Sequence, residues 1–213
     1  MTLRPSYTTR VADYEPTAFN RAILYVLDHV SSVPMTRLHK LLFLADLEYF
    51  LEHGQTITEA PWVREKYGPM NRAMLPVLKA MSEHEVDQEE HETRQGRTVH
   101  VIRKGRDPRF GAALDEARAQ VLDRVLSMTA RLSDDEVKAL AYSTTPMRVL
   151  EGWERHEGRK LLNTPIDFKR LSDPTEIEVP DEVPDLEARA RERMEILEAM
   201  RPFIERALTG AGS

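Results

Sequence analysis

The sequence of 213 residues contains no cysteine. This absence excludes disulfides, thiolate zinc sites, iron–sulfur clusters and cysteine nucleophiles, and it fits a reducing compartment best. Catalytic motifs are also missing, because the sequence has no glycine-rich phosphate loop, no His-Glu-x-x-His and no Gly-x-Ser-x-Gly. We therefore expect a protein that is not an enzyme and that needs no cofactor.

Long apolar stretches are missing too. The first 16 residues lack the apolar segment of a secretory signal, and nowhere does the chain approach the roughly 18 apolar residues of a membrane span. We expect a cytoplasmic protein that does not contact a membrane. The formal net charge of -6 argues against a nucleic-acid partner, because sequence-independent binding depends on lysine and arginine displacing counterions from phosphates.

Apolar residues at helical spacing are frequent in the rest of the sequence. Phe19, Ile23 and Leu27 predict a helix over 16–30. A second helix is expected over 35–53, ended by Gly54, and its apolar residues lie on more than one side, so it should be the hub of the fold. A third helix is predicted over 69–81, with a kink or break at Pro76. Further helices are predicted over 111–130, 134–143 and 146–156.

A β-hairpin is predicted between the third and fourth helices. Polar and β-branched residues stand on either side of Gln95-Gly96, which would form its turn. Arg94 and Arg97 would lie at the tip, which resembles the wing of a winged-helix DNA-binding protein. The strand before the turn is strongly acidic and would repel phosphates. A solvated hairpin is therefore the favoured interpretation.

Histidine and aspartate residues recur at intervals that bear on metal binding. A two-residue turn at 95–96 would place His91 opposite His100, but two ligands alone are a weak signal. Along the second helix, three residues recur at intervals of seven: His39, Asp46 and His53. That interval separates neighbours by about 10 Å along the axis, too far for one ion. No metal site is expected.

The last part of the sequence differs in composition from the rest. Residues 171–187 contain three prolines and seven acidic residues with no basic one, which predicts a linker or extended arm. A final helix is expected from Asp185. Its apolar stripe would face a partner or a second copy of the chain, so a homo-oligomer is left open. The candidate partner-binding residues on it are Met194, Leu197, Met200 and Ile204.

The fold class follows from these elements. We predict a mainly α fold with a small β-hairpin (α+β), in which a compact helical domain forms around the central apolar helix. This domain would occupy 1–165, and the acidic, proline-containing arm with its amphipathic helix would occupy 166–213.

Charged residues inside the apolar second helix require an explanation. Lys40 and Asp46 would each cost several kcal/mol there unless paired or able to reach water. We expect Lys40 to extend to water at the helix start and Asp46 to bond to a backbone or side-chain group. The alternative is a groove near Lys40, Asp46 and Tyr67 that receives a partner.

Two segments together resemble the signature of the Panacea domain, the SocA-like antitoxin domain, which is related to phage proteins of the GepA type. They are MTRLHKLLFLADLEYFLEHGQTIT and WVREKYGPM. The resemblance is good from about residue 19 to 81 and extends to about 163, although residues 142–144 depart from the Ser and His usual in relatives. The matching residues are Lys40, Leu41, Leu42, Phe43, Ala45, Gly54, Trp62, Tyr67, Gly68, Pro69 and Met70.

The resemblance implies a bacterial or phage antitoxin that neutralises a cognate protein toxin, encoded nearby, by direct protein–protein contact. Some relatives pass the toxin to a protease system, which would be a second partner. The matching residues and Asp46 would be structural or partner-binding. If the turn at Tyr67 is structural, replacing this residue should unfold the protein. A winged-helix-like DNA-binding regulator and a phage or prophage accessory protein are left open as alternatives.

Overall fold

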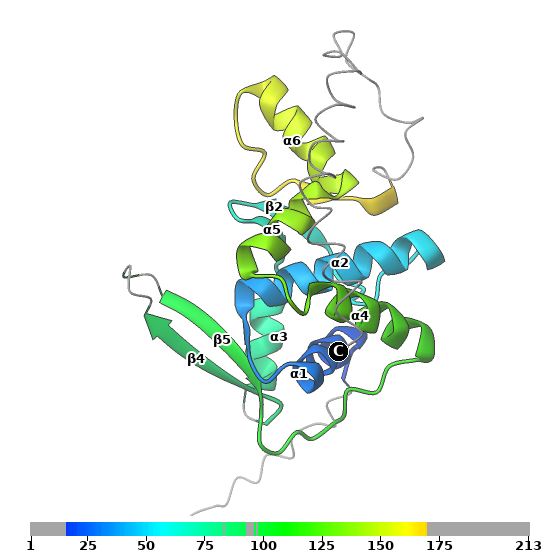
Figure 1. Cartoon of the computed structure of the whole chain (residues 1–213), viewed down its shortest axis with the longest axis vertical. Helices are drawn as coiled ribbons and strands as arrows, with labels where there is room; N and C mark the ends of the chain where they lie inside the picture. The colour runs from blue at the N-terminus through cyan, green and yellow to red at the C-terminus, as the bar shows by residue number, and fades with distance from the viewer. Residues whose placement is uncertain (1–15, 83, 93–95, 97, 170–213) are drawn as a thin grey trace, which may run out of the picture.

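The computed structural model describes residues 16–82, 84–92, 96 and 98–169 (Figure 1). These residues form a mainly helical α+β fold, as predicted. The helices are α1 (Ala18–His29), α2 (Met35–His53), α3 (Met74–Met81), α4 (Glu116–Thr129), α5 (Asp134–Ser143) and α6 (Thr145–Glu157). The strands are β1 (Val33–Pro34), β2 (Trp62–Glu65), β3 (Gly68–Asn71), β4 (Val86–Glu92), β5 (Thr98–Lys104) and β6 (Pro165–Ile166).

Helix α2 is the centre of the core, as its apolar pattern predicted. It contacts α1, α4, α5 and β3, and the buried residues of its middle cover more than one side of the helix. Gly54 ends it in a left-handed conformation with φ of 70°, which glycine adopts without a steric cost. Because α2 is enclosed on several sides, its buried charged residues must find partners inside the protein.

Capping interactions fix the starts of the flanking helices. Thr17 and Asn20 form a capping box at the start of α1, and Ser133 and Glu136 form another at the start of α5. Helix α4 begins at Glu116, behind the cap Asp115, and not at 111 as predicted. The capping side chain of Asp115 satisfies the first turn at that point, so the helix has no need to begin earlier.

The prediction of a third helix starting at Gly68-Pro69 was wrong. Gly68–Asn71 is strand β3, paired antiparallel with β2 so that Glu65 lies opposite Gly68 and Trp62 opposite Asn71. Helix α3 begins only at Met74. Pro76 therefore lies in its first turn, where a missing backbone donor leaves no intrahelical bond unmade, and the helix continues to Met81 without a break.

The predicted hairpin exists as β4 and β5, which project from the helical body (Figure 1). Its register differs by one residue from the prediction, since His91 lies opposite Val99 and His100 opposite Glu90. A shift of one residue moves side chains to opposite faces, so the two histidines do not form a pair. The tip residues Arg94 and Arg97 lie outside the described residues, and the winged-helix interpretation stays a hypothesis.

The described chain ends beside the core. Strand β6 pairs with β2, and Phe168 is buried against Phe43 and Phe50 of α2, with ring centroids 5.6 Å apart in both pairs. The domain division at 165 and 166 stays a prediction. The partner-helix candidates Met194, Leu197, Met200 and Ile204 lie outside the described residues.

Candidate functional site

Asp46 is completely buried and binds the loop that follows α2. Its carboxylate accepts hydrogen bonds from the backbone N–H of Thr58 at 2.9 Å, from the Thr58 hydroxyl, and from Trp62 Nε1 at 2.8 Å. Burial raises the pKa of Asp46 to about 6, against the lowering effect of the bonds from Thr58 and Trp62. The prediction that Asp46 would bond to backbone and side-chain groups is confirmed.

The prediction that Lys40 would extend to water was wrong. Its side chain is only 6% exposed, and Nζ donates a 2.7 Å hydrogen bond to the backbone oxygen of Pro69. Burial, together with the positive charges of Lys138 and Arg64, lowers the pKa of Lys40 to about 7. Lys40 therefore attaches β3 to the central helix.

His39, the neighbour of Lys40, is also buried and binds the other end of β3. Its Nδ1 lies 3.4 Å from the backbone nitrogen of Asn71, which acts as the donor. Burial, with the charge of Lys40, lowers the pKa of His39 to about 3, so the ring is neutral at pH 7. Two consecutive residues of α2 thus hold both ends of one short strand.

Gly68 allows the β2–β3 turn to approach α5 closely. Its φ is +103°, and a Cβ at this position would lie 2.7 Å from Tyr142 Cε2 and 3.3 Å from Lys40 Cε. No larger residue fits there without a shift of the neighbouring side chains. The glycine of the motif is therefore required by packing as well as by backbone conformation.

A buried ion pair joins the same hairpin to α6. Arg64 is 1% exposed, and its Nε and Nη2 lie 3.0 Å from the two oxygens of Glu154. Burial alone would raise the pKa of Glu154, but hydrogen bonds from Arg64 and Lys160 hold it below its usual range. Arg64 also donates to the Tyr142 hydroxyl at 3.1 Å. The pair fixes α5 and α6 relative to the hairpin.

Tyr67 stands apart from these residues, because 60% of its surface is exposed. It occupies the two-residue turn between β2 and β3, where Lys66 Nζ lies 5.3 Å from the centre of its ring. A side chain so exposed contributes little to the core, so the expectation that replacing Tyr67 unfolds the protein does not fit the structure. The residues around it are buried and bonded within the protein, whereas the Tyr67 side chain is exposed.

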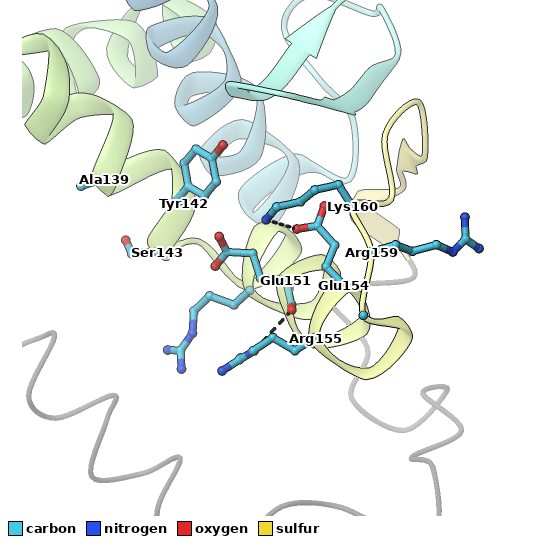
Figure 2. Close-up of a pocket in the computed structure, with 10 residues that line it drawn as sticks. Ala139, Tyr142, Ser143, Glu151, Glu154, Arg155, Arg159 and Lys160 are labelled. Atoms are coloured by element: carbon cyan, nitrogen blue, oxygen red, sulfur yellow. Dashed lines mark hydrogen bonds and ion pairs between the residues drawn. The ribbon is translucent and has the colours of Figure 1, made fainter.

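An open groove of about 700 Å³ lies between α5 and α6 (Figure 2). We call it the α5–α6 groove. A second hollow of about 420 Å³ shares Ala139 and Tyr142 with it and extends to Asp135 and Lys138. The groove is lined by Ala139, Tyr142 and Ser143 from α5, by Arg148, Glu151, Glu154 and Arg155 from α6, and by residues 158–160. The lining of the groove combines four basic side chains with two glutamates and one aromatic ring.

The comparisons with known proteins give one match. A family model described as "Antitoxin SocA-like, Panacea domain" matches residues 38–146, just over half of the chain. The chain belongs to this Panacea family. Neither the comparison with curated proteins nor the one with solved structures finds a significant match.

The match to the Panacea family covers the residues that hold the β2–β3 hairpin to α2. Several of the residues predicted from the resemblance meet at one contact: Leu41, Leu42 and Phe43 lie in the core, Trp62 bonds to Asp46, and Pro69 accepts from Lys40. Glu154 lies beyond the matched segment, so the ion pair joins Arg64, inside the match, to a part of α6 outside it.

Sequence reasoning missed Arg64, Tyr142 and Glu154 of this Panacea domain. Arg64 and Glu154 are 90 residues apart, so no local pattern connects them. A signal existed for Arg64 alone, because alternation in an extended segment places it on the same side as Trp62.

In the described part of the chain, no helix is long and apolar enough to cross a membrane, and no three histidine, aspartate or glutamate side chains gather as a metal site would require.

Proposed function

We propose that this protein is an antitoxin that neutralises a cognate toxin, encoded nearby, by forming a direct protein–protein complex. Membership of the SocA-like antitoxin family supports this proposal. The observation that carries it is the contrast within the β2–β3 hairpin, where the buried polar residues are bonded inside the protein and Tyr67 at the turn is exposed. An exposed aromatic side chain on a rigidly held turn suits binding to another protein.

Tyr67 has the properties of an anchor residue at an interface. Tyrosine is enriched among the residues that dominate binding energy. The turn that carries it is held by the bond from Lys40 to Pro69 and by the close packing of Gly68 on Tyr142. Because its backbone is already fixed, Tyr67 would lose less conformational entropy on binding than a residue in a flexible loop.

The buried charges support binding in preference to catalysis. Asp46, Lys40 and the Arg64–Glu154 pair each have a structural partner within hydrogen-bond distance. Shifted pKa values also occur in structural networks and do not by themselves identify a catalytic site. We therefore assign these groups to the scaffold that presents the binding surface.

Growth on induction of the neighbouring open reading frame tests the proposal. Cells carrying that frame alone should stop growing, and coexpression of this protein should restore growth and yield a stoichiometric complex in a tagged pull-down. Tyr67→Ala should lose the rescue, whereas Leu75→Ala, which truncates another exposed apolar side chain on α3, should keep it. A harmless neighbour, or rescue without a complex, would overturn the antitoxin proposal.

A further inference from the structure

The α5–α6 groove and the hollow beside it carry more basic than acidic side chains, although the chain as a whole has a net charge of -6. We propose that the acidic arm of this same chain, residues 171–187, binds in this groove. The interaction is intramolecular and does not depend on the identity of the toxin.

Arg159 and Lys160 of the groove pair with Glu157 and Glu154, but the other basic side chains of the groove and the hollow have no described carboxylate partner. Among the described residues, no carboxylate pairs with Lys138, Arg148 or Arg155. Glu154, at the base of the groove, is already bonded to Arg64 and Lys160, and Figure 2 shows Lys160 turned onto it. Glu151 in the groove and Asp135 in the hollow remain as carboxylates against the three cations Lys138, Arg148 and Arg155, so positive charge stays in excess by one.

Lys40 provides independent support for a positive potential behind the groove. Its ammonium group bonds to a backbone oxygen and not to a carboxylate. Besides burial, the charges of Lys138 and Arg64 lower the pKa of Lys40, and of these two cations only Arg64 has a described carboxylate partner, Glu154. A negatively charged segment lying over Tyr142 and Lys138 would supply the missing compensation.

Residues 171–187 fit this requirement in charge and in reach. They contain seven acidic residues and no basic one. The described chain ends at Lys169, just after β6, which pairs with β2, the strand that Arg64 joins to α6. An extended segment spans up to about 3.5 Å per residue, so the arm is long enough to reach the groove. Tethering would give it an effective concentration on the order of millimolar, which favours it over a free competitor.

The proposal is tested with a fluorescent synthetic peptide of residues 171–187 and two forms of the full chain. One form is wild type, and in the other the seven acidic residues of the arm are replaced by their amides. If the wild-type arm occupies the groove, the peptide should bind the neutralised form at least tenfold more tightly at low salt. Equal binding to both forms, including no binding to either, would overturn the proposal.

Charge reversal locates the binding site. In the neutralised form, Arg148→Glu with Arg155→Glu should reduce peptide binding at least tenfold. The matched control, Lys79→Glu with Arg106→Glu, changes the net charge equally at exposed positions and should leave binding within twofold. Should the reversed variant fail to fold, Arg148→Gln with Arg155→Gln gives the same test with a smaller change. Equal losses in the groove and control variants would show nonspecific attraction and refute the assignment.

A toxin segment is the alternative occupant of the groove. In that case, reversal at Arg148 and Arg155 would weaken the toxin complex, while wild-type and neutralised chains would bind the peptide equally. That combination would contradict the intramolecular contact and leave the antitoxin function intact, so the two proposals fail in distinguishable ways.

Discussion

The contact between α2 and the β2–β3 hairpin and the α5–α6 groove lie on either side of Tyr142, yet their charges have different surroundings. In the first region Lys40, Asp46 and Arg64 are buried and each is bonded to a defined partner. In the groove, Arg148 and Arg155 face an open space without a described carboxylate partner.

This difference separates charges that hold the fold together from charges that can bind a partner. A buried charge without a partner is costly, so the first region tolerates no change in its pairing. Charges in an open groove remain hydrated and can exchange water for an anionic partner. Glu154 belongs to both regions, because it lines the groove and holds Arg64. We therefore expect the largest losses of stability in the first region.

The largest effect is expected at Glu154. Glu154→Ala leaves Arg64 buried without its carboxylate, and should lower the free energy of unfolding by about 3–5 kcal/mol, measured by urea denaturation. The double variant Arg64→Met with Glu154→Met should lose less than Glu154→Ala, since no charge is left unpaired. A loss below about 1 kcal/mol for Glu154→Ala would mean that the Arg64–Glu154 pair contributes no more than an exposed ion pair.

Asp46 should come next. Asp46→Ala removes the acceptor of three hydrogen bonds from Thr58 and Trp62, and should lower the free energy of unfolding by about 3 kcal/mol. Asp46→Asn should lose less, because its amide oxygen still accepts from the backbone of Thr58. If the two substitutions were equally harmful, the negative charge itself and not the acceptor geometry would be what the loop requires.

The close approach at Gly68 predicts a smaller loss. Gly68→Ala should lower the free energy of unfolding by about 2 kcal/mol, because of the positive φ and the clash with Tyr142. Gly152→Ala is the matched control, since a Cβ there meets nothing within 4 Å in the middle of α6. That control should be more stable by about 0.5–1 kcal/mol. Thermal unfolding of both variants decides whether the turn is as tightly packed as described.

His39 predicts how stability depends on pH. Its pKa falls from 6.5 to about 3 on folding, so below pH 6.5 the unfolded chain takes up a proton that the folded protein does not. Stability from this residue is therefore complete above pH 6.5 and is lost as the pH falls towards 3, by up to about 1.4 kcal/mol per pH unit. His39→Asn should show a smaller slope in urea titrations between pH 6.5 and 4.5.

The difference between His39→Asn and wild type isolates this effect from that of Asp46. The pKa of Asp46 rises from 3.8 to about 6 on folding, which makes Asp46 stabilising at acid pH and gives a trend of the opposite sign over about pH 4–6. Identical slopes for the variant and wild type would mean that His39 takes up a proton in the folded protein as readily as in the unfolded chain.

Elements set by local sequence could be predicted. The central position of α2 followed from apolar residues on more than one side, and the predicted bounds of α5, 134–143, match the structure. The β2–β3 hairpin could not be recognised, because Gly68-Pro69 is equally typical of a helix start. The β4–β5 register also failed, since Gln-Gly is a weak turn signal and the connection covers 93–97.

The candidate site was only partly predictable. Its α2 and hairpin residues were found through the family resemblance, whereas the Arg64–Glu154 pair depends on tertiary contacts across 90 residues. The α5–α6 groove lies between two helices that both contact Arg64, α5 through Tyr142 and α6 through Glu154. No periodicity in the sequence carries this information.

Tyr67→Ala separates toxin binding from folding, because Tyr67 is proposed to bind the toxin while its neighbours form the scaffold. The free energy of unfolding and the affinity for the toxin should be measured on the same preparation. We predict a stability within about 0.5 kcal/mol of wild type and an affinity at least tenfold weaker. Unchanged affinity, or a loss of stability with binding preserved in the folded fraction, would contradict the account.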